Sequence, residues 1–90
     1  MTDQSKEFMK KRLLWRATHR GIKEMDLIAG GFAAVRLPYM SQLELEEFEI
    51  LLELPDQDLL AWVTLQEAIP ETLASPLLLD LIAFRPDLGK

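Results

Sequence analysis

The chain has 90 residues, of which 49% are hydrophobic and 28% charged, with only four glycines and five prolines. This composition is typical of one small globular domain and excludes a disordered, collagen-like or low-complexity chain. Cysteine is absent, which excludes disulfides, thiol nucleophiles and cysteine-ligated metal centres. The net charge of −5 is uneven, because residues 1–36 hold eight Lys/Arg and four Asp/Glu, whereas residues 37–90 hold two and eleven. We therefore expect a basic face and an acidic face.

The sequence lacks the signals of membrane insertion and export. No apolar stretch approaches the roughly 20 residues that span a bilayer. The first residues carry acidic side chains and no apolar run behind a basic start, so they do not resemble a signal peptide. We expect a cytoplasmic protein.

Residues 5–19 have the hydrophobic period of an amphipathic helix with a basic outer face. Phe8, Arg12, Trp15 and His19 share one face, with Met9 and Leu13 beside it. Glycine just past the last periodic residue commonly ends a helix in the left-handed conformation. We expect Gly21 to do so here.

A second helix is expected from residue 22 to residue 37, ended by Pro38. Gly30 and Gly31 in its middle lower helix propensity by roughly 1 kcal/mol each, which suggests that another element packs closely there. The apolar residues at helical spacing are Ile22, Met25, Ala29, Phe32 and Val35.

Three shorter helices follow. Ser41 and Glu44 form the capping box that starts the third. Pro55-Asp56 starts the fourth, which we expect to reach Gln66, and Ser75-Pro76 is the N-cap and first-turn proline of the fifth, which Pro86 ends. The apolar stripes expected in the core are Leu45, Phe48, Leu51 and Leu52, then Leu59, Trp62 and Val63, then Leu77, Leu78, Leu81, Ile82 and Phe84. Five helices with short connections predict an all-α five-helix bundle, a single domain over residues 1–90 with its core in residues 6–86.

The residues do not predict an enzyme. His19 is the only histidine, which excludes a multi-histidine metal site, and near a helix C-terminus it is expected to interact with the helix dipole. There is no phosphate-binding loop or dinucleotide fingerprint. The carboxylates of residues 44–53 lack the spacing of a calcium loop and are interpreted as a solvated helix face. We expect no catalytic residue, no metal and no directly bound cofactor.

The corner between the first two helices, residues 16–26, leaves two readings open. In one, Gly21 simply ends the helix and Arg20 pairs with Glu24 across the turn, which at an exposed site contributes about 0.5 kcal/mol or less. In the other, the corner is a docking surface, because glycine lets a partner's backbone approach and arginine offers a planar set of donors. The residues alone do not choose between them.

A resemblance favours docking. The order of motifs is similar to that of the succinate dehydrogenase assembly factors (SdhE-type flavinylation factors), whose signature is Arg-Gly-x-x-Glu. The matching stretches are Arg12-Leu13-Leu14-Trp15, residues 19–26, Phe32-Ala33, residues 54–62 and Ser75-Pro76-Leu77. The sequence departs from the family's pattern at Leu65, where relatives often have glycine, and at Gly31, which is commonly polar.

The resemblance implies a five-helix bundle that binds the flavoprotein subunit of succinate dehydrogenase, or of fumarate reductase, and promotes covalent attachment of FAD to it. The FAD then belongs to the client protein. By position, the signature is Arg20, Gly21 and Glu24, and Ile22, Lys23 and Asp26 flank it. Arg16, with Lys10, Lys11 and Lys23, is expected to steer docking.

Two alternatives remain. The basic first helix and turn resemble a helix-turn-helix corner, which would suit a nucleic-acid-binding or antitoxin-like regulator, but the acidic remainder would repel phosphate. A free-FAD carrier is the other, although no phosphate cradle is visible. Oligomeric state is not predicted by the sequence.

Overall fold

The computed structural model describes residues 2–84, with side chains from residue 5 onward. It contains α1 (Thr2–Thr18), α2 (Lys23–Arg36), a 3-10 turn η1 (Leu37–Tyr39), α3 (Gln42–Leu52), α4 (Asp56–Val63) and α5 (Pro76–Ala83). These five α-helices, with no strand among residues 2–84, confirm the predicted all-α bundle. The expected stop at Pro86 lies outside the described residues. None of the described helices is both long and apolar enough to cross a membrane.

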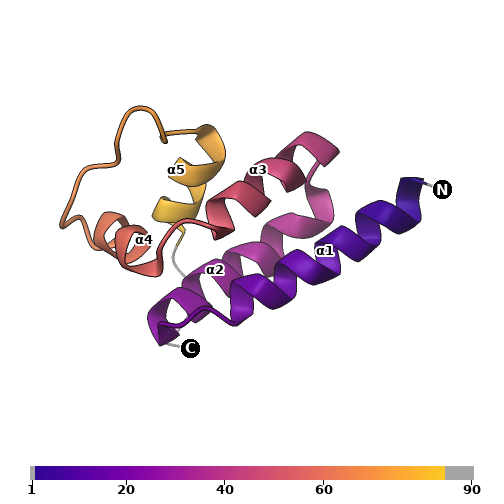
Figure 1. Cartoon of the computed structure of the whole chain (residues 1–90), viewed down its shortest axis with the longest axis horizontal. Coiled ribbons are helices and arrows are strands. Elements are labelled where there is room, and N and C mark those ends of the chain that lie inside the picture. The colour runs from indigo at the N-terminus through magenta and orange to yellow at the C-terminus, as the bar shows by residue number, and fades with distance from the viewer. Residues whose placement is uncertain (1, 85–90) are drawn as a thin grey trace.

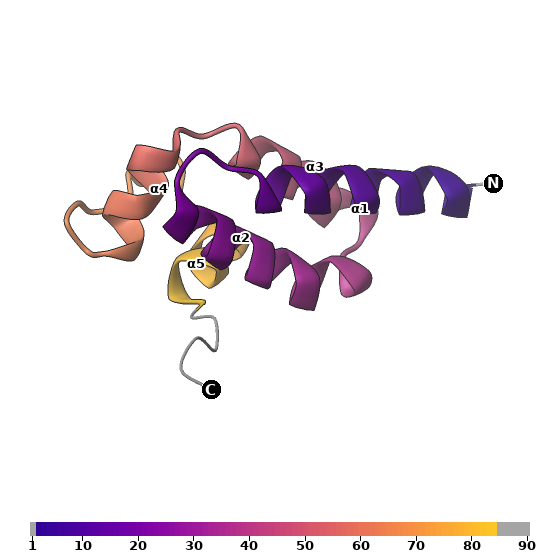
Figure 2. The same ribbon diagram turned by 90° about the horizontal axis from the view of Figure 1, so that it is seen from below.

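The helices form two layers. α1 and α2 run antiparallel and pack against each other, and α3 packs against α1 (Figure 1). Seen from the side, α1 and α3 lie in one layer, and α2 and α5 lie in the other (Figure 2). The N-terminal end of α1 extends beyond the rest of the bundle in both views.

The core confirms most of the predicted apolar stripes. Phe32 of α2 lies at its centre, where its ring centroid is 5.8 Å from those of both Phe48 and Phe84. Every expected core residue of α3 and α4 is buried, as are the four leucine and isoleucine positions of α5. The capping box of Ser41 and Glu44 and the N-cap of Ser75 are also present.

The predicted apolar face of α1 was wrong. Phe8 and Trp15 are 71% and 62% exposed, whereas Leu13 and Ala17 are fully buried. Alanine at residue 17 lets α1 lie close to α2, so the buried stripe passes through the smaller residues and leaves the large aromatic side chains outside. Val35 of α2, also expected on an apolar face, is likewise exposed, at 56%.

The close approach expected at the glycine pair is confirmed at Gly30. A Cβ atom added there would lie 2.7 Å from Cγ2 of Thr18, far closer than van der Waals contact. α1 and α2 therefore meet across this position with room for hydrogen only.

α4 ends earlier than predicted, so Gln66 lies outside it. The amide of Gln66 donates to the carbonyl of Ala61 at 2.8 Å, and the amide of Leu65 donates to that of Trp62 at 3.1 Å. This is the Schellman pattern, which requires a left-handed residue after the cap. Leu65 takes that conformation, with φ of 63°, and its side chain is 82% exposed.

Candidate functional site at the corner between α1 and α2

The end of α1 is closed by side chains and not by a left-handed glycine. The hydroxyl of Thr18 lies 3.0 Å from the carbonyl oxygens of both Leu14 and Trp15, and Nδ1 of His19 lies 2.7 Å from the Trp15 oxygen. A carbonyl only accepts, so His19 donates there. The Trp15 oxygen is one of the last four carbonyls of the helix, which have no intrahelical amide partner. The left-handed conformation expected of Gly21 is consequently absent, and its φ is not positive.

Arg20 is directed into the protein. Its Nε donates to Oδ1 of Asp56 at 2.6 Å, its Nη1 donates to the carbonyl of Leu52, and its Nη2 donates to that of Leu54 at 3.0 Å. The side chain is only 9% exposed. Because Leu52 is the last residue of α3, the guanidinium supplies donors to the C-terminal end of that helix. The predicted pair of Arg20 with Glu24 is therefore wrong.

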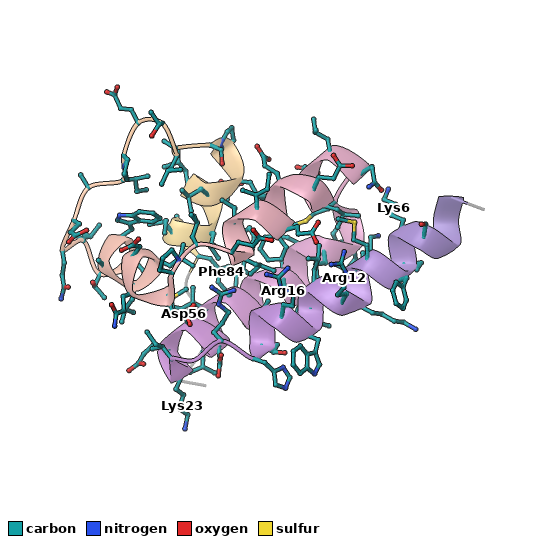
Figure 3. All side chains as sticks on the ribbon, in the orientation of Figure 1. Lys6, Arg12, Arg16, Lys23, Asp56 and Phe84 are labelled. Carbon is teal, nitrogen blue, oxygen red and sulfur yellow. The ribbon has the colours of Figure 1, made fainter. Side chains whose placement is uncertain are left out.

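Two carboxylates hold the backbone of the corner. Oδ2 of Asp56 accepts from the amide of Gly21 at 3.0 Å, while the other oxygen of the same carboxylate binds Arg20. The Asp26 carboxylate on α2 accepts from the amide of Arg20. Asp56 begins α4, so this helix meets α1, α2 and the end of α3 at the turn, and Figure 3 shows its side chain directed at the corner.

The surface that remains available is small. Gly21, Lys23 and Glu24 are exposed, and Lys23 points away from the protein (Figure 3). Ile22 is half-buried and packs against the core. Arg16 is half-buried and lies 3.9 Å from Glu49 of α3.

Gly21 itself is open to a partner. A Cβ atom added to it would meet Oδ2 of Asp56 at 3.7 Å, which is ordinary contact, and its backbone conformation is one that any residue adopts. The fold thus does not require glycine at this position. A requirement for glycine would have to come from something that docks on it.

Asp56 is the residue that sequence reasoning missed. It was interpreted only as the start of a helix, although it belongs to the Pro-Asp-x-Asp-Leu stretch that carries part of the resemblance. Its separation of 36 residues from Arg20 hides the pairing from any local pattern.

The site offers positions and charges. Within the described residues, no group of three or more His, Cys, Asp or Glu side chains is arranged to hold a metal ion. Each polar side chain at the corner's interior is committed to a hydrogen bond inside the protein. What remains exposed at the corner is the backbone at Gly21, held by the hydrogen bonds from its amide to Asp56 and from the preceding amide to Asp26.

This geometry belongs to a chain whose residues 11–85 match the model of the family described as flavinator of succinate dehydrogenase. The protein is a member of that family. It is 37% identical over 73 residues to the FAD assembly factor SdhE of Acetobacter pasteurianus, covering 81% of this chain and 67% of that one. It is 31% identical over 72 residues to the mitochondrial succinate dehydrogenase assembly factor 2 of Dictyostelium discoideum, and 40% identical over 63 residues to that of Yarrowia lipolytica.

The matches cover less of the eukaryotic relatives than of this chain. They include 80% and 70% of the present sequence but 51% of the Dictyostelium protein and 43% of the Yarrowia protein. The chain therefore corresponds to about half of these mitochondrial relatives.

Proposed function

We propose that this protein binds the flavoprotein subunit of succinate dehydrogenase and promotes covalent attachment of FAD to that subunit. The family match over residues 11–85 supports the function. The observation that carries the site is the exposed backbone of Gly21, fixed in place by Asp56 although no feature of the fold demands glycine there.

The bond-forming chemistry in this proposal belongs to the client, whose histidine attacks the flavin. The assembly factor contributes no reacting group, is not an enzyme and carries no FAD of its own. It holds the client so that histidine and flavin are correctly oriented, an effect that accelerates reactions strongly when reacting groups are otherwise misplaced.

In this proposal the signature and flanking residues have two roles, contact with the client and support of the turn. Gly21, Lys23 and Glu24 contact the client, because they are exposed. Arg20 and Asp26 do not contact the client directly. Their polar groups form hydrogen bonds within the protein and hold the turn in shape. Ile22 anchors the turn to the core, and Arg16 adds positive charge that steers encounter.

The test compares Gly21→Arg with Gly21→Ala in cells that contain no other copy of the protein. Arginine would place a long side chain on the docking edge, whereas alanine adds one methyl group with room for it. We expect both variants to fold with near wild-type thermal stability. Covalent flavin fluorescence of the client in a denaturing gel should be lost with arginine and mostly retained with alanine. Normal covalent flavin with a folded Gly21→Arg protein would refute the docking role of the corner.

We also propose that the client range includes the flavoprotein subunit of fumarate reductase and that the protein works in the bacterial cytoplasm. Similarity to the Acetobacter factor supports the bacterial setting, and the resemblance described above supports the second client. Co-purification with each flavoprotein subunit, separately expressed, tests the range. The two alternatives make their own predictions: a salt-dependent DNA shift for a nucleic-acid binder, and saturable tryptophan quenching by free FAD for a carrier.

A further inference from the structure

α1 carries an apolar stripe that the bundle does not cover. Leu13 and Ala17 face the core, but Phe8 and Trp15, seven residues apart and so on one face, are 71% and 62% exposed. Leu14 beside them is 38% exposed. The ring of His19 stacks on that of Trp15 with centroids 4.1 Å apart, which fixes the indole at the surface.

This stripe borders two adjoining hollows along the seam between α1 and α2. They have volumes of about 270 and 380 Å³ and share three lining residues, so they form one continuous depression, here called the α1–α2 groove. Its α2 side consists of glycine and alanine, whose small side chains leave the space open. The shared residues are Lys11, Leu14 and Ala34, and Trp15, Thr18 and Gly30 line the end nearer the corner.

The charge beside the groove is positive. Lys11 is exposed, and its ammonium group has no hydrogen bond or ion pair with any described residue. Glu7, the one carboxylate of the lining, lies 3.7 Å from the ammonium of Lys10 and is offset by it. An occupant that combines apolar side chains with carboxylates therefore suits this surface.

The groove continues from the docking corner. Thr18 lines one end, and its hydroxyl lies 3.0 Å from Nδ1 of His19, two residues before Gly21. A client that covers Gly21 would lie within three residues of the groove along the chain.

We propose that the α1–α2 groove receives an amphipathic helical segment of the flavoprotein client, with carboxylates along its rim and apolar side chains directed at Leu14 and Trp15. Grooves between helices take such segments through anchors spaced three, four and seven residues apart. This inference rests on the proposed function, because it takes the client as the occupant. It extends the contact surface from one turn to the length of α1.

The test titrates purified flavoprotein subunit lacking covalent FAD with Trp15→Glu and Lys11→Glu variants, using calorimetry. Ile50→Glu is the matched control, because Ile50 is 65% exposed on α3, away from the groove. All three side chains are exposed, so each variant should melt with the wild type. We expect Trp15→Glu to weaken binding by about tenfold or more, as loss of an aromatic anchor does. Lys11→Glu should weaken it less at high salt than at low salt, and Ile50→Glu should leave affinity within about twofold.

A photoreactive residue in place of Ala34 identifies the occupant. Cross-linking to an acidic, helical stretch of the client supports the inference. Cross-linking only to a second copy of the chain, with self-association lost in Trp15→Glu, overturns it in favour of a homodimer. If Gly21→Arg abolishes binding while Trp15→Glu does not, the inference about the groove is refuted and the proposed function is retained. If the wild type does not bind the client, both the groove inference and the proposed function are refuted.

Discussion

Arg20 and Asp56 form an ion pair with Nε and Oδ1 2.6 Å apart, and the second oxygen of the same carboxylate holds the amide of Gly21. One side chain from the start of α4 thus fixes both halves of the Arg-Gly dipeptide. The arginine of the signature is consequently a structural element of the turn, and the glycine beside it is the element presented outward.

Removing that carboxylate should destabilise the protein. We expect Asp56→Ala to lower the free energy of unfolding by about 2–3 kcal/mol, because it leaves a nearly buried guanidinium and a backbone amide without their acceptor. Urea denaturation measures the change. Asp80→Ala is the control, since the Arg36–Asp80 pair is 3.1 Å long but its side chains are 34% and 54% exposed, and we expect a loss of about 1 kcal/mol or less. Equal stabilities of the two variants would contradict the role given to Asp56.

Leu65 should be replaceable with a gain in stability. Its left-handed conformation carries a penalty of roughly 1 kcal/mol for a residue with a Cβ atom, and its exposed side chain contributes little packing. Leu65→Gly should therefore raise the free energy of unfolding by about 1 kcal/mol. Leu65→Ala, which keeps the Cβ atom, should show no comparable gain. Thermal melts of the two variants and the wild type measure the difference. A glycine variant less stable than the alanine variant would show that the conformation is not strained.

Gly30 should not tolerate alanine. The added methyl group would overlap Cγ2 of Thr18, whose hydroxyl is bound to two carbonyls and so resists rotation. We expect Gly30→Ala to lose about 1–2 kcal/mol of stability despite the better helix propensity of alanine.

Thr18→Ser provides the matched second site, because it keeps the hydroxyl and removes the methyl group. In a double-mutant cycle it should recover most of the loss caused by Gly30→Ala. Purely additive effects of the two substitutions would place the clash elsewhere.

Glu24 should matter for the client and not for the fold. Its side chain is exposed and makes no hydrogen bond or ion pair with the described residues. Glu24→Gln should leave the melting temperature unchanged and reduce covalent flavin on the client, measured by gel fluorescence. Glu71→Gln, which removes the charge of an exposed carboxylate in the connection between α4 and α5, should leave flavinylation at the wild-type level. A matching loss in both variants would indicate a general charge effect.

Local patterns predicted the parts of this fold that depend on neighbours in sequence. The capping box at Ser41 and the N-cap at Ser75 are satisfied within a few residues, and the leucine stripe of α3 follows one helical period. The apolar face of α1 failed because periodicity finds hydrophobic residues without saying which of two stripes meets the bundle. The small residues Ala17 and Gly30 allow α1 and α2 to approach each other, and such residues contribute little to a hydrophobic pattern.

That residues 20–24 bind a partner stays a prediction, and the arrangement of their side chains was not predictable from the sequence. Gly21, Lys23 and Glu24 are exposed, yet the direction of Arg20 depends on carbonyls and a carboxylate more than 30 residues away. Likewise, the sequence showed only that Leu65 stands where relatives often have glycine. The positive φ of Leu65 in the structure gives the reason, because the turn after Trp62 needs a left-handed residue at this position.

The two tryptophans differ in environment, so the intrinsic fluorescence of the protein reports two different events. Trp62 is 4% exposed in the core, whereas Trp15 is 62% exposed and stacked on His19. Loss of the folded state moves the indole of Trp62 from an apolar medium into water and shifts its emission to the red. Coverage of Trp15 by another molecule shifts emission to the blue. The direction of the spectral change therefore separates melting from complex formation in an unlabelled sample.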